Sequence, residues 1–219
     1  MSIFYIGLSL LSNRKAGARS LHAEGRRILT LLEGGRSLSG RIAAEPGGRP
    51  YFIDRHGDFS ISHSHRMAAA AYSAEKSPGA GKPLVTGCDI QYVHPAKTYE
   101  GIVRGFFSSE EQAYIAAGSP ERERITRFYR IWVLKECFLK ALGLSVFDMN
   151  RAPSFVARGD LKDEINGPPI SLRFYLYELG NSGSGRYLLA AAAEREQEDL
   201  FGCPPAVLWF SEESLPVSK

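Results

Sequence analysis

Residues 121–142 restrict the fold of this chain more than any other segment, because they read as one long helix. Apolar residues recur there at helical spacing in two series, which are Ile131, Leu134, Phe138 and Leu142, and Ile125, Phe128, Trp132 and Leu139. A Gly-Ser-Pro turn at 118–120 precedes the pattern and Gly143 follows it, as expected at the two ends of a helix. Any fold of this chain must therefore pack a long helix against its other elements.

Strand and helix patterns lie on both sides of this segment. Residues 58–65 alternate, with apolar side chains on one face and serines on the other. A helix is expected over 21–32, ending at two glycines, and another after Ser108, whose spacing to Glu111 is that of a capping box. Strands are expected at 3–10, 58–65, 67–72, 84–93, 170–179 and 187–193, with 67–72 pairing to 58–65 and the last two forming a hairpin.

The order of these elements predicts an α+β fold in two halves. A strand, a helix and further strands come first, and helices and strands follow a segment at 94–104 that has few apolar residues and a proline. A length of 219 residues suffices for one large domain or two small packed ones. We therefore predict two similar α/β halves, residues 1–97 and 98–219, each too small to bury a good core alone.

The composition excludes several classes of protein. A hydrophobic content of 44% and an aromatic content of 11% exclude a disordered chain, and the lack of a Gly-x-y repeat excludes a collagen. Three cysteines far apart in sequence exclude a disulfide framework and a cysteine-only zinc site, so we expect a cytoplasmic protein. The apolar run at 3–11 has no positive charge before it, and no segment reaches the roughly 20 apolar residues of a membrane span, so neither a signal peptide nor membrane association is expected.

Positive charge is concentrated in the first quarter of the chain. The net charge is only +3, but residues 1–55 hold nine Lys or Arg and four Asp or Glu, which gives 9 − 4 = +5 there. Eight of the nine cations are arginines, whose forked side chain suits phosphate oxygens. Charge alone leaves four interpretations open: a solvated helix face, a phosphorylated small molecule, nucleic acid, or an acidic protein partner.

Two pairs of polar residues suggest a metal site. Asp89 and Gln91 are two apart in an expected strand, so their side chains leave the same face. Glu136 and Lys140 are four apart in the long helix, one turn above the other. A carboxylate from a strand and one from a helix are ligands of the kind that Mg²⁺ takes together with waters and substrate phosphates. The alternative is a routine surface ion pair between Glu136 and Lys140.

The run Ser62-His63-Ser64-His65 admits three interpretations. A serine hydrolase lacks support, because the chain has no G-x-S-x-G motif and adjacent residues of a strand point to opposite faces. A metal pair of His63 and His65 needs further ligands, which the other histidines do not supply at metal-binding spacing. The third interpretation is a polar strand end that binds a phosphate. A purely structural histidine also remains open.

Five short motifs, taken in order, resemble the 4′-phosphopantetheinyl transferases. They are GRPY at 48–51, FSISHS at 59–64, GCDIQ at 87–91, FFSSEE at 106–111 and WVLKECFLKALG at 132–143. The chain is most similar to the surfactin-synthetase-activating type of that family, from about residue 45 to 145. The resemblance implies an α+β chain of two pseudo-symmetric α/β subdomains, with the active site in the cleft between them.

The resemblance also implies an activity. Enzymes of this family move the phosphopantetheine arm of coenzyme A to a serine of an apo acyl or peptidyl carrier protein and release adenosine 3′,5′-bisphosphate. The cofactor implied is Mg²⁺, the co-substrate is coenzyme A, and the partner is an acidic, helical carrier domain rather than nucleic acid or a membrane. A monomer is expected, because one chain supplies both sides of the cleft.

Carried over by motif, Asp89 and Glu136 hold Mg²⁺ on the coenzyme A diphosphate, and Gln91 takes the third ligand position, which is usually acidic. Glu136, Lys140 and Asp89 form the catalytic set, with Glu136 or a water that it orients as general base. Gln91 is the main departure from the family pattern. A neutral amide should hold the metal less tightly, so Gln91→Glu is expected to lower the magnesium requirement.

The same resemblance implies a set of residues that bind coenzyme A. Ser62 and His63 contact its phosphates, with His63 toward the 3′-phosphate or adenosine end, and Arg49 replaces a lysine of the family at a phosphate. The other implied positions are Lys135, Lys140, Arg19 and Ser20.

Two surfaces, residues 104–107 and 122–130, combine arginines with apolar residues and are candidates for docking the carrier protein. Two alternative functions stay open beside the transferase. One is a non-catalytic nucleotide- or phosphate-binding module of the same fold, and the other is a metallohydrolase that uses His63 and His65.

Overall fold

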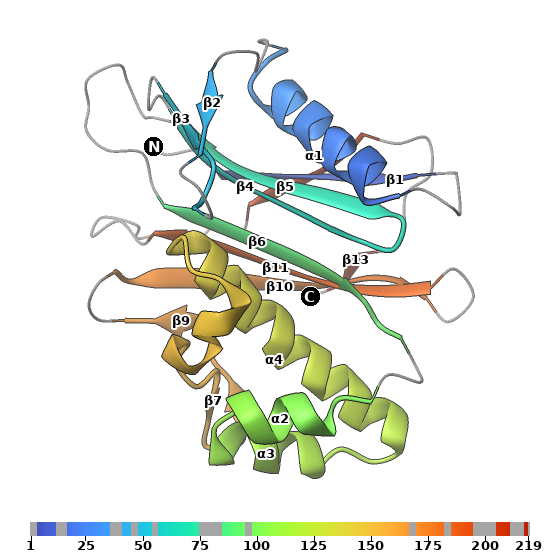
Figure 1. Cartoon of the computed structure of the whole chain (residues 1–219). Coiled ribbons are helices and arrows are strands. Elements are labelled where there is room, and N and C mark those ends of the chain that lie inside the picture. The colour runs from blue at the N-terminus through green and yellow to red at the C-terminus, as the bar shows by residue number, and fades with distance from the viewer. Residues whose placement is uncertain are drawn as a thin grey trace.

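The computed structural model describes residues 4–11, 17–35, 41–44, 48–53, 57–74, 85–94, 98–166, 170–181, 185–194, 205–210 and 217–218. Two β-sheets, each packed against one long helix, form the frame of the fold (Figure 1). The first sheet packs against α1 (Ala18–Leu32), and the second against α4 (Glu121–Ala141). The predicted α+β fold is confirmed.

The first sheet holds four strands in the order β12-β1-β5-β4. These are β12 (Ala206–Trp209), β1 (Phe4–Leu10), β5 (Met67–Ala74) and β4 (Gly57–Ser64). The strands β4 and β5 form an antiparallel hairpin, as predicted, and His65 opens its turn with a φ of 53°. α1 packs closely on this hairpin because Gly25 leaves room for the side chain of Ile61.

The second sheet holds the order β13-β10-β11-β6, and β9 (Glu164–Ile165) pairs with β10. Its strands are β13 (Val217–Ser218), β10 (Leu172–Asn181), β11 (Gly185–Glu194) and β6 (Thr86–Tyr92). The long hairpin of β10 and β11 is the one predicted near the end of the chain. Since β11 pairs with all of β6, the hairpin holds β6 in place beneath α4.

Gly87 allows α4 to approach β6 closely. A Cβ atom at this position would collide with the backbone oxygen of Cys137 and would lie 3.0 Å from the Cβ of Ala141. Both of these residues belong to the second half of α4. The glycine two residues before Asp89 therefore brings that aspartate against the helix that carries Glu136 and Lys140.

Side chains of β4 join the two sheets where backbone pairing does not. Within the described residues no backbone ladder joins β4 to β6. Instead, Asp58, Ser62 and Ser64 accept hydrogen bonds from backbone N–H groups of β6, at 2.7, 3.2 and 2.9 Å respectively. These residues are two or four apart and lie on one side of β4. The alternating polar side chains of β4 thus join the two sheets by hydrogen bonds to the backbone of β6.

A hydrophobic core fills the space between the two sheets. It combines Ile6 and Leu8 of the first sheet with Ile90 and Leu189 of the second. Alanines on β5 and β11 are buried in the same region, and their short side chains let the sheets lie close together. Two further cores lie under α1 and between α4 and the second sheet.

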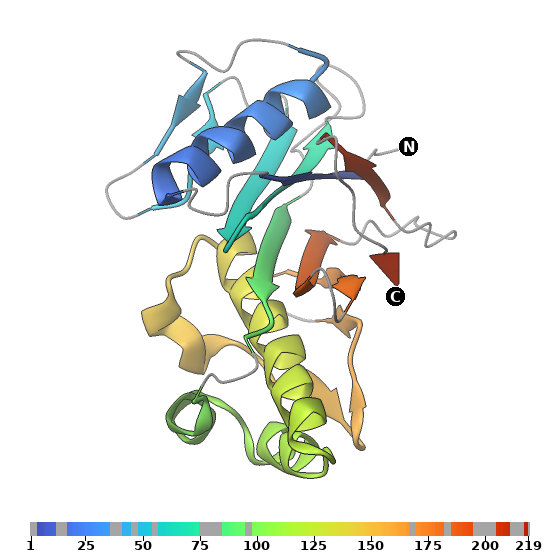
Figure 2. The same ribbon diagram turned by 90° about the vertical axis from the view of Figure 1, so that its right-hand side faces the viewer.

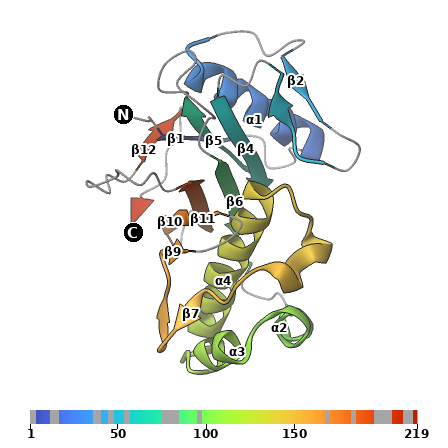
Figure 3. The same ribbon diagram turned by 90° about the vertical axis from the view of Figure 1, so that its left-hand side faces the viewer.

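The sheets do not follow the boundary predicted between residues 97 and 98. β6 lies before that boundary but pairs with β11, and β12 lies after it but pairs in parallel with β1. Figure 3 shows β12 lying beside β1 in the first sheet, whereas the last strand, β13, pairs with β10 in the second. The halves 1–97 and 98–219 therefore exchange strands, and each sheet needs residues from both.

Three α-helices follow β6 in the described part of the chain, and the sequence predicted two of them. The capping box of Ser108 and Glu111 is present at the start of α3 (Ser109–Ala116). The segment at 94–104, which was expected to join the two halves without regular structure, contains most of α2 (Glu100–Phe106), whose Val103 is buried. The sequence does not predict this helix, because two glycines lower its helix propensity and few apolar residues mark a buried face.

The remaining elements are short. They are β2 (Ile42–Ala43) paired with β3 (Tyr51–Phe52), η1 (Val146–Arg151) after α4, and β7 (Val156–Ala157) paired with β8 (Asp160–Leu161). Among the described helices, none combines the length and the apolar character needed to cross a lipid bilayer.

Candidate active site

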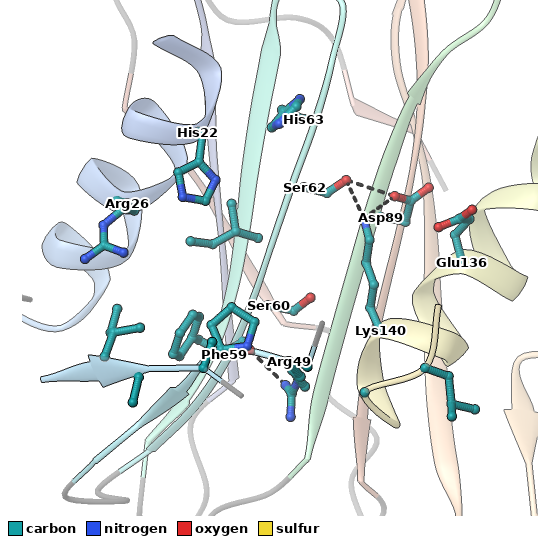
Figure 4. A pocket seen from close by; sticks show the side chains of 18 of the residues that line it. His22, Arg26, Arg49, Phe59, Ser60, Ser62, His63, Asp89, Glu136 and Lys140 are labelled. Carbon is teal, nitrogen blue, oxygen red and sulfur yellow. Dashed lines mark hydrogen bonds and ion pairs between the residues drawn. The ribbon is translucent and has the colours of Figure 1, made fainter. Parts of the chain in front are cut away.

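A cavity of about 760 Å³ lies where the two sheets and their helices meet. One wall comes from α1, β2 and β4, and the other comes from β6, α4 and the turn that follows α4. Figure 4 shows charged side chains entering this space from α1, β6 and α4, and polar side chains entering it from β4. Residues from both halves of the chain therefore line one cavity.

Asp89 is a buried carboxylate of the cavity that three other side chains contact. It is 1% exposed, and its Oδ1 accepts hydrogen bonds from Lys140 Nζ at 2.6 Å and from Ser62 Oγ at 2.8 Å. Its Oδ2 accepts one from Gln91 Nε2 at 3.1 Å. Lys140 also donates to Ser62 Oγ at 2.9 Å. Four predicted site residues from three elements thus form one hydrogen-bonded cluster around a buried carboxylate.

Glu136 is the second carboxylate of the cavity. It lies one turn before Lys140 on α4, and its side chain points toward Asp89 (Figure 4). Burial disfavours the charged form of Lys140, but the attraction of Asp89 and, more weakly, of Glu136 outweighs it and raises the pKa of Lys140. A carboxylate from a strand and one from a helix thus line the same cavity, and Lys140 is bonded to the first of them.

The donor set of this cluster fits Mg²⁺. Two carboxylates and one amide are hard oxygen donors, and Mg²⁺ normally completes its shell with waters and substrate phosphates. Gln91 currently turns its amide nitrogen toward Asp89, so its oxygen would have to replace the nitrogen to reach a metal. Among the described residues no three side chains of the types His, Cys, Asp and Glu gather in one place. The site thus offers fewer anionic ligands than a zinc or calcium site usually does.

Arg49 is bonded within the protein rather than left open to a ligand. Its Nη2 lies 2.7 Å from Asp58 Oδ2 and donates to the carbonyl oxygens of Phe59 at 2.8 Å and Thr86 at 2.6 Å. The carboxylate of Asp58 neutralises its charge, and the three bonds fasten the segment around residue 49 to β4 and β6. Its buried Nε has no partner among the described residues. Arg49 lines the cavity, as predicted, but its bonds chiefly hold the segment around residue 49 against β4 and β6.

The wall formed by α1 carries two cavity residues that the sequence analysis missed. His22 and Arg26 are four apart on α1 and face the cavity together (Figure 4). Within the described part of the chain, the Arg26 guanidinium makes neither an ion pair nor a hydrogen bond. The available signal was their spacing of one helical turn in the arginine-rich region. Arg19 and Ser20, which were predicted to bind cofactor, lie exposed in the first turn of α1 and do not line the cavity.

His63 faces these residues from β4. Burial lowers the pKa of His63 below its ordinary value, and the positive charges of Lys140 and His22 lower it further. A bound phosphate would reverse this effect, because a negative charge favours the imidazolium. His63 is therefore placed to become protonated when an anion binds in the cavity.

Two other predicted residues lie away from the cavity. Lys135 is 2% exposed and its Nζ lies 3.1 Å from Glu111 Oε2 in the core beneath α4. It is five residues from Lys140, and at 100° per residue the two side chains point about 140° apart around the helix. His65 lies in the turn after β4 and stacks on Tyr92, with 4.6 Å between ring centroids. The structure thus separates His65 from His63, and the helical wheel alone could have separated Lys135 from Lys140.

Comparisons with known proteins point to one family. Residues 86–192 match the family model of the 4′-phosphopantetheinyl transferase superfamily. The 4′-phosphopantetheinyl transferase HetI of Nostoc sp. is 28% identical over 119 residues, which are 48% of this chain and 46% of the relative. The transferase pptA of Paxillus involutus is 31% identical over 167 residues, 69% of this chain and 61% of the relative. AcpT of Salmonella typhi, also named a 4′-phosphopantetheinyl transferase, is 32% identical over 91 residues, 42% of this chain and 43% of the relative.

The chain spans about half the length of the curated relatives that it matches. The matched range nevertheless contains both carboxylates of the cavity, because it includes β6 with Asp89 and Gln91 and α4 with Glu136 and Lys140, whereas Ser62 lies before it. Through residues 86–192, the chain belongs to the 4′-phosphopantetheinyl transferase superfamily.

Proposed function

We propose that this protein transfers the 4′-phosphopantetheine arm of coenzyme A to a serine of an apo carrier protein, in a reaction that depends on Mg²⁺. The observation that carries the proposal is the cluster of Asp89, Glu136 and Lys140 in a cavity with cationic side chains on the opposite wall. Both walls come from one chain, so the proposal needs only a monomer. The cytoplasmic location expected from the cysteines stays a prediction.

The cavity suits a substrate with phosphates at two places. Lys140 supplies a positive charge beside Asp89 and Glu136 at one end. Arg26, His22 and His63 supply cationic or protonatable groups on the α1 side. Coenzyme A carries a diphosphate and, on its ribose, a separate phosphate monoester. We place the diphosphate at Lys140 and the monoester at the α1 wall.

The reaction breaks one phosphoanhydride bond and forms one phosphodiester. The serine hydroxyl of the carrier attacks the phosphorus next to the pantetheine arm, and adenosine 3′,5′-bisphosphate leaves with the electron pair of the broken P–O bond. The carboxylate of Glu136 takes the proton of that hydroxyl, since it lines the cavity at one side of the cluster. Lys140 stabilises the negative charge that develops on the phosphate oxygens.

Asp89 and Glu136, with the amide oxygen of Gln91 or a water in the third position, would hold Mg²⁺. Bound there, the metal supplies neutralisation of the diphosphate charge. Asp89 also positions Ser62 and Lys140 through its Oδ1, so its role does not end with the metal. The low exposure of Asp89 keeps bulk water away from these bonds, which strengthens them.

The test is a transfer assay with the intact protein. Coenzyme A, Mg²⁺ and several apo carrier domains are incubated with the protein, and mass spectrometry looks for the added arm on the carrier. Glu136→Gln should lower the rate by at least about 100-fold, because the group loses both its charge and its basicity. Glu110→Gln on exposed α3 is the matched control and should transfer normally.

A complete lack of transfer to every carrier, with coenzyme A still bound, would contradict the proposal and favour the non-catalytic binding module. The metallohydrolase receives no support from the structure, because His63 and His65 lie in different surroundings and no third histidine, cysteine or carboxylate joins them among the described residues.

A further inference from the structure

An apolar side chain projects into solvent beside the mouth of the cavity. Gly143 and Leu144 line the cavity, and η1 follows them directly. Phe147 on η1 is 91% exposed, more than any other large apolar residue that the structure describes, and Val146 beside it is 41% exposed. Burying a phenylalanine is worth about 1.5–3 kcal/mol, which the protein alone leaves unused here.

The turn that carries Phe147 is fixed in place. The backbone N–H and the hydroxyl of Ser145 both donate to Asp148 Oδ2 at 3.0 Å, which closes a capping box across the turn. Met149, two residues after Phe147, is fully buried in the core under α4. Phe147 is thus held in solvent, because Ser145 and Asp148 bond across the turn and Met149 is buried beneath it. Together with the exposed Val146, such an aromatic residue is a candidate contact for a protein partner.

Two exposed arginines lie on the same side of the molecule as these apolar residues (Figures 2 and 3). Arg151 ends η1 with its side chain 65% exposed, and its bond to Asp148 is long, at 3.4 Å. Figures 2 and 3 show α2 on the same side of the molecule as η1, and α2 presents Arg104 and the partly exposed Phe106. Arg104 has no carboxylate partner among the described residues. An apolar centre with arginines at its rim fits a protein partner that is acidic around an apolar patch.

The second candidate for docking is less suitable. On the 122–130 segment, Arg127 pairs with Glu123, Arg130 pairs with Glu178 at 2.6 Å, and Arg124 pairs with Glu121. These internal pairs cancel most of the positive charge that the sequence shows there. The segment also begins at the opposite end of α4 from Gly143 and the cavity.

We infer that Arg104, Phe106, Val146, Phe147 and Arg151 form a docking surface for the acidic carrier domain, with Phe147 as its apolar anchor. This inference rests on the proposed function, since that reaction requires a protein serine to reach the cavity. Docking beside Gly143 and Leu144 brings the partner to the rim of the cavity that holds Glu136 and Lys140. The arginines draw the acidic domain toward this rim, and Phe147 holds it there.

The experiment measures carrier binding apart from transfer. The probe is an acidic apo acyl carrier domain whose acceptor serine is replaced by alanine, and its Kd is measured by titration calorimetry at two salt concentrations. Phe147→Ala should weaken binding by about 10- to 30-fold, the loss typical of an interface hot spot, with the affinity for coenzyme A unchanged. Leu208→Ala is the matched control, because Leu208 is 39% exposed on β12, which lies on the other side of the molecule (Figure 3).

A second variant tests the charges. Arg104→Glu combined with Arg151→Glu should weaken carrier binding more at low salt than at high salt. Equal carrier affinity of Phe147→Ala and the unaltered protein would overturn the inference, whatever the transfer assay gives. Carrier binding that depends on Phe147 without any transfer would support the docking surface and contradict only the proposed function. If the unaltered protein neither binds nor modifies any carrier, both are contradicted.

Discussion

Replacing Lys135 with methionine should destabilise the protein strongly and leave its affinity for coenzyme A unchanged. Lys135 Nζ lies 3.1 Å from Glu111 Oε2, donates to the carbonyl oxygen of Pro153 at 3.2 Å and lies 5.5 Å from the centroid of the Phe107 ring. Burial lowers the pKa of Lys135, although Glu111 opposes this effect. Methionine keeps most of the side-chain volume but removes the charge, so Glu111 would remain without its cation.

The structure sets the size of this effect. Glu111 is fully buried, and removing one partner of a buried ion pair costs about 3–5 kcal/mol. Glu111 keeps two backbone N–H donors, from Ser108 and from Phe155, each at 2.9 Å, which places the loss near the lower end, about 3 kcal/mol. Adding Glu111→Gln should recover only part of it. The glutamine has no charge to pair, but it offers one oxygen where the two carboxylate oxygens each accept a backbone bond.

The assay is urea unfolding of the unaltered protein, Lys135→Met and the double variant, together with a coenzyme A titration of each folded protein. The midpoint should shift while the slope of the transition stays the same. Lys140→Met is the comparison variant, which should weaken coenzyme A binding because Lys140 lies in the cavity. A stability loss below about 1 kcal/mol in Lys135→Met would refute the account of a buried, charged pair. A loss of coenzyme A affinity in the folded variant would instead restore the cofactor role expected of Lys135 from the sequence.

Three further predictions concern the cavity. Gln91→Glu should lower the magnesium concentration for half-maximal transfer and tighten Mg²⁺ binding in direct calorimetry; an unchanged or higher requirement would remove Gln91 from the metal shell. Arg26→Gln should weaken binding of coenzyme A at least about 10-fold but barely affect binding of 3′-dephospho-coenzyme A. The control is Arg27→Gln, which should bind both ligands normally because Arg27 is paired with Glu24. Equal losses of affinity for the two ligands in Arg26→Gln would contradict this prediction. The pKa of His63 in the folded protein lies below its ordinary 6.5, so the unfolded chain binds a proton at His63 more readily than the folded protein does. The free energy of unfolding should therefore fall as the pH drops below 6.5. His63→Asn should reduce that fall in urea unfolding at stepped pH, and an identical pH profile would show that His63 does not titrate as inferred.

Local patterns predicted most of the regular structure. The alternation of residues 58–65 and the helical spacing of residues 121–142 depend only on which side of an element each side chain faces, so sequence suffices to read them. The same holds for the capping box at Ser108, whose partner is three residues away. The sequence did not predict α2, because its two glycines lower its helix propensity. The burial of Val103, which stabilises this helix, depends on tertiary packing that local patterns do not show.

Long-range pairing was beyond local patterns. β12 pairs in parallel with β1 about two hundred residues earlier, and nothing within the four residues of β12 specifies that neighbour. The pairing of β6 with β11 likewise breaks the simple division at residue 97. Strand partners are chosen by the whole core, because backbone bonds form equally well with many strands.

At the site, the sequence determined which groups are present, and the motif spacing already linked Asp89 to Glu136. The tertiary structure decided which charges remain for a ligand. Arg49 is neutralised by Asp58 and Lys135 by Glu111, while Arg26 faces the cavity without a carboxylate among the described residues. The physical reason is that a charge acts on a ligand only if no nearer opposite charge compensates it, and that distance is a property of the folded chain.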